Sequence, residues 1–93
     1  MKKYEVMYII RPEVEEEARK ALVEEINAAF TANNSTVDKV DEWGIRDLAY
    51  EIAKCRKGYY VVLNVTATVE ALNEFTRLAN IKENVIRHIV VAE

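Results

Sequence analysis

The sequence has little cysteine, glycine or proline, and it has no long apolar run. Its single cysteine cannot form an internal disulfide. Two glycines and one proline exclude collagen-like and proline-rich disordered chains. No apolar run exceeds five residues, so no segment can span a bilayer. Lys2 and Lys3 resemble the start of an export signal, but Glu5 and Arg11 leave too short an apolar segment between them. We therefore expect a cytoplasmic protein without a membrane contact.

Residue types that carry chemistry are also sparse. His88 is the only histidine, which excludes a His-pair metal site. Cys55 lies between two cations, but no second cysteine supports redox chemistry. The acidic residues from Glu13 to Glu17 are typical of a solvated first turn of a helix. With no glycine-rich phosphate loop and no nucleophile motif, we predict no enzyme, no metal, no cofactor and no small-molecule substrate.

Length and charge further restrict the number of domains and the kind of nucleic-acid contact that the chain can make. The 93 residues are enough for one small domain, which we expect to cover residues 1–93. Thirteen basic and 16 acidic side chains give a net charge of −3. A protein that binds nucleic acid unaided is usually strongly basic. Any contact with a polyanion must therefore come from a local basic patch.

Hydrophobic spacing predicts six elements in the order strand, helix, strand, strand, helix, strand. The expected strands are 2–10, 36–43, 59–66 and 85–92. The first helix should begin near Pro12 and end at Asn33 and Asn34. Thr68 should cap the second helix, whose apolar face carries Leu72, Phe75, Leu78 and Ala79.

With right-handed crossovers, this order gives an α+β fold, the ferredoxin-like split βαβ arrangement. Its four-stranded antiparallel sheet has two helices on one face and leaves the other face open. Alternation places Tyr4, Val6, Tyr8, Ile10, Leu63, Val65, Ile86, His88 and Val90 toward the helices. The open face should carry Met7, Ile9, Tyr60, Val62, Ile89 and Val91 around Glu5 and Arg87. Such an apolar patch usually marks a partner surface, with a homodimer or a shifted strand register as alternatives.

Basic residues concentrate at the predicted hairpin between the second and third strands, and aromatic residues lie among them. The basic ones are Arg46, Lys54, Arg56 and Lys57, with Lys2 and Lys3 at the start and Lys82 and Arg87 near the last strand. The aromatic ones are Tyr4, Trp43, Tyr50, Tyr59 and Tyr60. Cations neutralise phosphates and rings stack on unpaired bases, so this pattern favours RNA contact. An ordinary solvated loop could have the same composition.

The segment Lys57-Gly58-Tyr59-Tyr60-Val61-Val62 partly resembles a strand motif of RRM domains. That motif has an aromatic residue at its fifth position, where this sequence has Val61. It also requires Tyr59 on the open face, which is opposite to the side that alternation predicts. An RRM-like RNA-binding domain remains an alternative.

Several segments occur in an order that resembles the bacterial small-subunit ribosomal protein six family over essentially the whole chain. They are Tyr4-Glu5, Ile10-Arg11-Pro12, Gly44-Ile45-Arg46-Asp47-Leu48-Ala49-Tyr50, Lys57-Gly58-Tyr59-Tyr60 and Asn84-Val85-Ile86-Arg87. The resemblance implies a ferredoxin-like fold and a structural role in the central domain of the small ribosomal subunit. It implies binding to small-subunit rRNA together with small-subunit ribosomal protein eighteen, and neither enzymatic activity nor a cofactor.

Two sets of contact residues follow from the resemblance and the pattern together. The residues expected at rRNA are Lys2, Lys3, Tyr4, Arg46, Lys54, Arg56, Lys57 and Arg87. The residues expected at the partner protein are Met7, Ile9, Tyr50, Tyr60, Val62, Ile89 and Val91.

Two other protein classes could use this fold. An ACT-like regulatory module binds an amino acid at a dimer interface and is usually fused to an enzyme, which a length of 93 residues disfavours. An acylphosphatase-like enzyme needs a glycine-rich anion loop after the first strand, where this sequence has Arg11-Pro12-Glu13.

Overall fold

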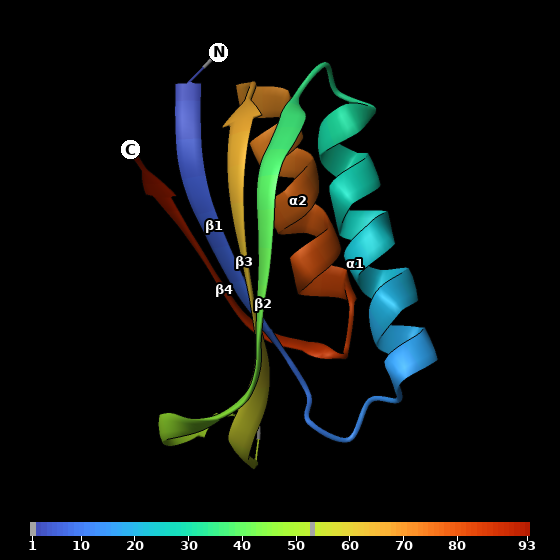
Figure 1. Ribbon diagram of the computed structural model, residues 1–93, viewed down its shortest axis with the longest axis vertical. Helices are drawn as coiled ribbons and strands as arrows, with labels where there is room; N and C mark the ends of the chain where they lie inside the picture. Colours follow the sequence, from blue (N-terminus) through green and yellow to red (C-terminus); the bar gives the residue numbers. More distant parts are fainter. Residues whose placement is uncertain (1, 53) are drawn as a thin grey trace.

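The computed structural model describes residues 2–52 and 54–93. Its elements are β1 (Lys2–Ile10), α1 (Glu16–Thr31), β2 (Thr36–Ile52), β3 (Cys55–Ala67), α2 (Val69–Ile81) and β4 (Val85–Ala92). The sheet has the order β2-β3-β1-β4, and every neighbouring pair is antiparallel. Both helices cover the same face (Figure 1). The predicted ferredoxin-like split βαβ fold is confirmed. Among the described residues, no helix combines the length and the apolar character needed to cross a membrane.

The core lies between the sheet and the two helices. The strands supply Val6, Tyr8, Ile10, Val61, Leu63 and Val65, and the helices supply Leu22, Ile26, Phe30, Phe75 and Ala79. The Phe75 ring lies 5.8 Å from Phe30 and 6.1 Å from Tyr8, measured between ring centroids. The predicted facing of β1 and β3 is confirmed, since their alternate residues are these core residues.

The first helix begins later than we expected. Pro12 lies outside it, because α1 starts at Glu16 with Glu15 as its N-cap. The segment that precedes the helix is held by the chain before β4. The Arg11 backbone N–H donates to the Asn84 carbonyl at 2.8 Å, and the Arg11 Nε–H donates to the Glu83 carbonyl at 3.1 Å. This anchoring keeps the segment out of the helix.

The end of α1 and the start of α2 are joined by hydrogen bonds. We expected α1 to end at Asn33 and Asn34, but it ends at Thr31 with Ala32 as its C-cap. Asn34 adopts a left-handed backbone, with φ 59°, in the turn that follows. Thr68 caps α2 as predicted, and its Oγ1 accepts from the Ala71 N–H at 3.2 Å. The Thr68 N–H in turn donates to Ser35 Oγ at 3.1 Å, which ties the turn after α1 to the first residues of α2.

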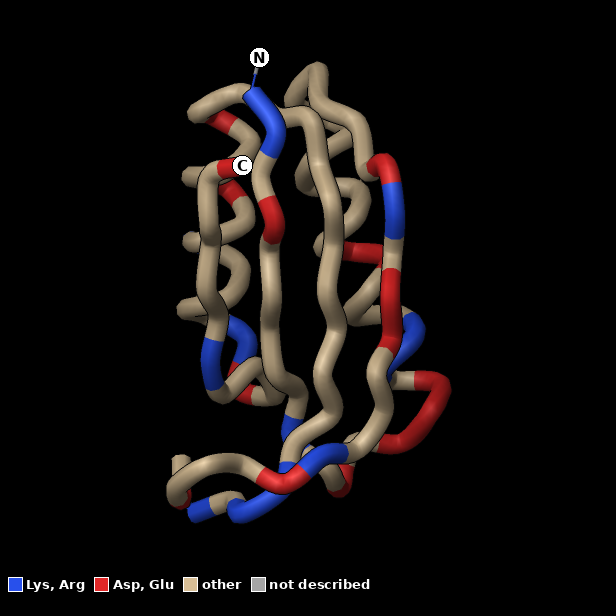
Figure 2. Tube along the Cα trace, turned by 60° about the vertical axis from the view of Figure 1, so that its left-hand side comes forward, with Lys and Arg blue, Asp and Glu red and all other residues tan. Residues whose placement is uncertain are grey.

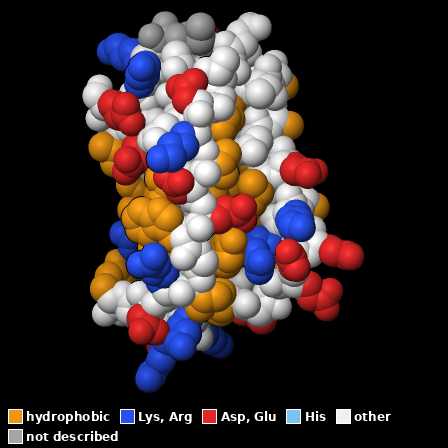
Figure 3. Space-filling view, in the orientation of Figure 1, with side chains coloured by type: hydrophobic (Ala, Val, Ile, Leu, Met, Phe, Trp, Pro, Cys, Tyr) orange, Lys and Arg blue, Asp and Glu red, His pale blue; other side chains and the backbone are white. Residues whose placement is uncertain are grey.

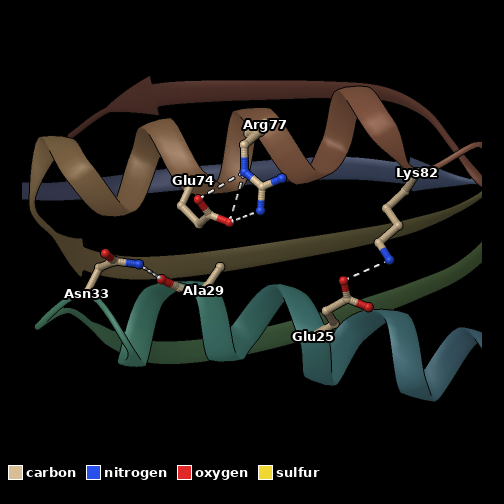
Figure 4. A network of polar contacts seen from close by, with 6 residues as sticks. All are labelled: Glu25, Ala29, Asn33, Glu74, Arg77 and Lys82. Carbon is tan, nitrogen blue, oxygen red and sulfur yellow. Dashed lines mark hydrogen bonds and ion pairs between the residues drawn. The ribbon is translucent and has the colours of Figure 1, made fainter.

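Polar contacts lie on the helical layer, both within the helices and between them (Figure 4). The Lys82 Nζ lies 2.8 Å from Glu25 Oε2, which links the end of α2 to α1. Arg77 binds Glu74 within α2. Pairs of this kind contribute little to stability because water screens them. The packing of the apolar core therefore decides the fold.

The facing predicted for β4 is correct in part. His88 points to the helical side, where its ring meets the edge of Phe75 at 5.7 Å between centroids. Val85 is also buried in the core, which simple alternation does not predict. The cause is a bulge: Ile9 pairs with Arg87 but Ile10 pairs with Val85, so Ile86 is an extra residue in β4.

Strands β2 and β3 are longer than predicted. We expected them to end at Trp43 and to begin at Tyr59, but pairing continues through Asp47 with Lys57 and Ile52 with Cys55. The residues that the composition suggested as a loop therefore form a two-stranded extension of the sheet. The register is irregular at Trp43 and after Asp47. The side chains therefore do not keep a regular alternation between the two faces, and the sequence pattern does not predict the extension.

We expect Ile26→Ala to lower the free energy of unfolding by about 2–5 kcal/mol, because Ile26 is fully buried and its loss leaves a cavity. Ile81→Ala is the matched control, since Ile81 is exposed on α2 and should change stability by less than about 0.5 kcal/mol. Urea denaturation measures both. Equal effects of the two substitutions would contradict this assignment of the core.

Candidate functional site

The extension of β2 and β3 forms an arm that lies across the open face of the sheet. We call residues 46–52 and 54–58 the hairpin arm. It begins where β1 ends, next to the pairing of Ile10 with Tyr59. In Figure 2 the arm passes below the strands from β2 toward β4. Its side chains line a shared concavity with those of the sheet, formed by Met7, Ile9, Leu48, Ala49, Tyr50, Ile52, Tyr60, Arg87 and Ile89.

A glycine allows the base of the arm to approach β1 closely. A Cβ on Gly58 would lie 2.2 Å from Ile9 Cγ2 and 3.6 Å from Leu48 Cδ2. The space that a side chain at position 58 would occupy is therefore filled by Ile9 from the neighbouring strand, and Leu48 from the arm lies next to it. Gly58 thus fixes how Ile9 packs beneath the arm.

The arm changes which apolar residues remain accessible. We expected Met7, Ile9, Val62 and Ile89 to form an exposed patch, but Ile9 keeps only 3% of its accessible surface and Val62 only 6%. Ile9 packs at the base of the arm, and Val62 lies on the central strand between Met7 and Asp41. The expectation that these two residues are exposed is wrong.

The other residues expected at a partner protein keep part of their surface. Met7, Tyr60 and Ile89 are partly buried. Tyr50 at 59% and Val91 at 52% are the most exposed of the set. The most accessible residues of this set therefore lie on the arm and on β4.

Tyr50 and Arg87 meet, although they are far apart in the sequence. The Arg87 guanidinium lies 5.7 Å from the centroid of the Tyr50 ring, and its Nη1–H donates to the Tyr50 hydroxyl. This contact joins the arm to β4. It brings together one residue expected at rRNA and one expected at the partner protein.

A group of cations lies at the base of the arm. Arg11, Lys54, Arg56 and Lys57, which we call the arm basic cluster, line one surface concavity together with Pro12, Glu13 and Cys55. The Arg11 Nη1–H donates to Cys55 Sγ at 3.5 Å. In Figure 3, Lys and Arg side chains gather at the lower end of the molecule. The sequence analysis did not predict Arg11 as a member of this cluster. Its position directly after β1 is the feature that could have indicated it.

Exposed carboxylates lie near two of the cations in this cluster. Glu13 lies 4.0 Å from Arg11, and Asp47 lies 3.9 Å from Lys57. Both carboxylates are largely exposed, so water and salt screen these pairs. The cluster can therefore exchange these partners for phosphate groups.

The predicted rRNA residues do not form one patch. Lys2 pairs with Ala67 at the end of the sheet opposite the arm, so the nine residues of β1 separate the N-terminal lysines from the arm by about 26 Å. The ends are visible in Figure 2. Tyr4 packs against the core on the helical side, so its ring does not face the open sheet. Lys2, Lys3 and Tyr4 are thus apart from Arg46, Lys54, Arg56, Lys57 and Arg87.

Tyr59 lies on the helical face. Its ring lies 4.0 Å from the Arg19 guanidinium carbon, and its hydroxyl donates to Glu42 at 3.0 Å. Burial, together with the Glu42 carboxylate, raises the pKa of Tyr59 above its ordinary value. Since the RRM motif requires this ring on the open face, the RRM-like reading of the segment is wrong.

Within residues 2–52 and 54–93, no three His, Cys, Asp or Glu side chains are grouped so that they could hold a metal ion. The pKa of Tyr8 is raised well above its ordinary value by burial in the core, and this hydroxyl is not accessible to a substrate.

Comparison with known proteins gives the family. The family model described as ribosomal protein S6 matches residues 3–92. The chain is also similar to the crystal structure of 30S ribosomal protein S6 from Thermotoga maritima, with 32% sequence identity and a TM-score of 0.93. That match covers 99% of this chain and 87% of the other.

We expect Gly58→Ala to destabilise the protein by about 1–3 kcal/mol, because the added methyl group overlaps Ile9 Cγ2. Combining it with Ile9→Ala should cost less than the sum of the two single substitutions, because the vacated space accepts the methyl group. A double-mutant cycle in urea measures this coupling. Gly44→Ala is the control: at φ +82° it is strained, but nothing lies within 4 Å of its added Cβ, so its effect should add to that of Ile9→Ala. Additive effects for Gly58 would contradict the close approach.

Proposed function

Because the chain belongs to the ribosomal protein S6 family, we propose that it binds small-subunit rRNA together with small-subunit ribosomal protein eighteen. The family consists of structural, non-enzymatic proteins of the small ribosomal subunit. The finer proposal places this chain in the central domain of that subunit, in the cytoplasm. The observation that carries the RNA contact is the arm basic cluster, a local positive surface on a chain with net charge −3.

The arm basic cluster is suited to phosphate groups. Arg56 and Lys57 are exposed, and the Lys57 Nζ lies 3.9 Å from the exposed Asp47 carboxylate, a pair that water screens. Both lie on β3, whose pairing with β2 at Lys57 and at Cys55 restrains the backbone that carries them. Binding a phosphate then costs mainly the entropy of the two side chains and of what motion the arm retains. Contacts of this kind position a protein on RNA without reading its sequence.

The exposed open face is suited to a protein partner. Exposed Tyr50 lines the concavity beneath the arm together with half-buried Met7 and Ile89. Exposed Val91 lies two residues beyond Ile89 on β4, where it pairs with Glu5. Because the chain is acidic overall, a basic partner would supply phosphate contacts that this chain lacks. Each of the two proteins would then strengthen RNA binding by the other.

We expect Arg56→Ala combined with Lys57→Ala to weaken binding to a central-domain rRNA fragment. The slope of log affinity against log salt concentration should fall by about two units, because two phosphate contacts are lost. Filter binding at several salt concentrations measures the slope.

The matched control is Lys20→Ala combined with Arg77→Ala, which removes the same charge from the helical face. It should leave the slope unchanged. If both double variants lower the slope equally, only net charge matters and the arm is not a specific contact.

We expect Val91→Lys to weaken binding of small-subunit ribosomal protein eighteen, because it places a cation where a basic partner docks. The protein should remain folded, since Val91 is exposed at 52%. Calorimetry of the two proteins measures the affinity.

Val69→Lys is the control, because Val69 is also exposed, at 64%, but lies at the start of α2 on the helical side. Equal affinity of the Val91→Lys variant and the wild type would move the protein contact away from this part of the open face.

A further inference from the structure

One exposed aromatic residue on the open face, Trp43, is used by neither contact described above, although its ring stacks on that of partly buried Tyr60. Trp43 keeps 48% of its accessible surface although it lies within β2. Its ring is nearly parallel to that of Tyr60, with an interplanar angle of 8° and 6.1 Å between centroids. The Arg46 guanidinium carbon lies 5.5 Å from the Trp43 ring centroid. We call these three residues the Trp43 stack.

The backbone holds the Trp43 stack in place. The register of β2 against β3 shifts between Glu42 and Gly44, so Trp43 is an additional residue at a bulge. Gly44 has φ +82°, a conformation that side chains disfavour. After the bulge, Gly44 pairs with Tyr60 and Arg46 with Gly58. The strand therefore turns the Trp43 side chain onto the Tyr60 ring and leaves it exposed to solvent.

The charges around the Trp43 stack favour an anionic occupant. Asp41 is paired with Lys39 at 3.5 Å. Glu42 accepts a hydrogen bond from the Tyr59 hydroxyl on the opposite side of the sheet. In the described part of the chain, no carboxylate lies at ion-pair distance from Arg46. An exposed cation thus lies beside two stacked rings.

We infer that the Trp43 stack binds one unpaired base of the rRNA, with the base stacked on Trp43 and Arg46 in contact with a neighbouring phosphate. A nucleotide carries a planar ring and an anion in one covalent unit, which matches this arrangement. A base-paired helix keeps its rings inside the duplex and cannot stack in this way. The inference rests on the proposed RNA binding and adds which RNA feature is recognised. A docked protein side chain is the competing occupant.

The first test uses the protein unchanged. Trp43 is the only tryptophan, so its fluorescence reports directly on this site. A short single-stranded oligoadenylate should quench the emission, and a duplex of the same length should not. Quenching by neither, or by both equally, would overturn the inference.

The second test compares variants on a central-domain rRNA fragment. Trp43→Leu should lower affinity roughly 5- to 150-fold, the range for loss of one stacked base. The salt slope should stay as in wild type, because no phosphate contact is removed. Trp43→Phe should restore most of the affinity, since it keeps a ring. Thermal melts check that both variants remain folded.

The outcomes separate this inference from the proposed function. If the wild type does not bind the fragment, the proposed function itself fails. If the wild type and the Trp43→Leu variant bind equally, RNA binding stands and the base contact is wrong. If Trp43→Leu instead weakens binding of small-subunit ribosomal protein eighteen in the absence of RNA, the occupant is a protein and the inference is also wrong.

Discussion

The approach of Ile9 to the backbone of Gly58 determines how the hairpin arm lies on the sheet. Because Gly58 has no side chain, Ile9 packs at the point where β3 leaves β1, and Leu48 of the arm lies next to it. From there the arm extends to β4, where Tyr50 meets Arg87. The concavity under the arm and the position of the arm basic cluster both follow from this one contact.

The distribution of charge explains how an acidic chain can present a surface to RNA. Acidic side chains are numerous on α1 and just before it, on the face opposite the open side of the sheet. The arm basic cluster lies at one end of the molecule, beyond the last pair of β1 (Figure 3). Since salt screens charges more than about 8–10 Å apart, the local cations act with little opposition from distant carboxylates.

The sequence was sufficient for the fold and less so for the site. Regular alternation in β1 and β3 identified both faces of the sheet, and Thr68 marked a helix start. The bulges at Ile86 and Trp43 each add one residue, which reverses the facing of the residues beyond them. The arm was missed for a related reason: its fold across the sheet depends on Gly58 and Ile9, which are distant in sequence. Contacts between residues that are distant in the sequence produce no local sequence pattern from which they could be predicted.

The contact between Tyr50 and Arg87 connects the proposed protein surface with the proposed RNA surface. Arg87 is oriented by Tyr50, so it is not an independent cation near the start of β4. A partner that covers the exposed Tyr50 ring would also restrict the arm, and with it Arg56 and Lys57 on the opposing strand. Ordering of the arm by one ligand reduces the entropy that the other must overcome. On this argument, cooperative binding of protein and RNA requires no change in the fold, only a more rigid arm.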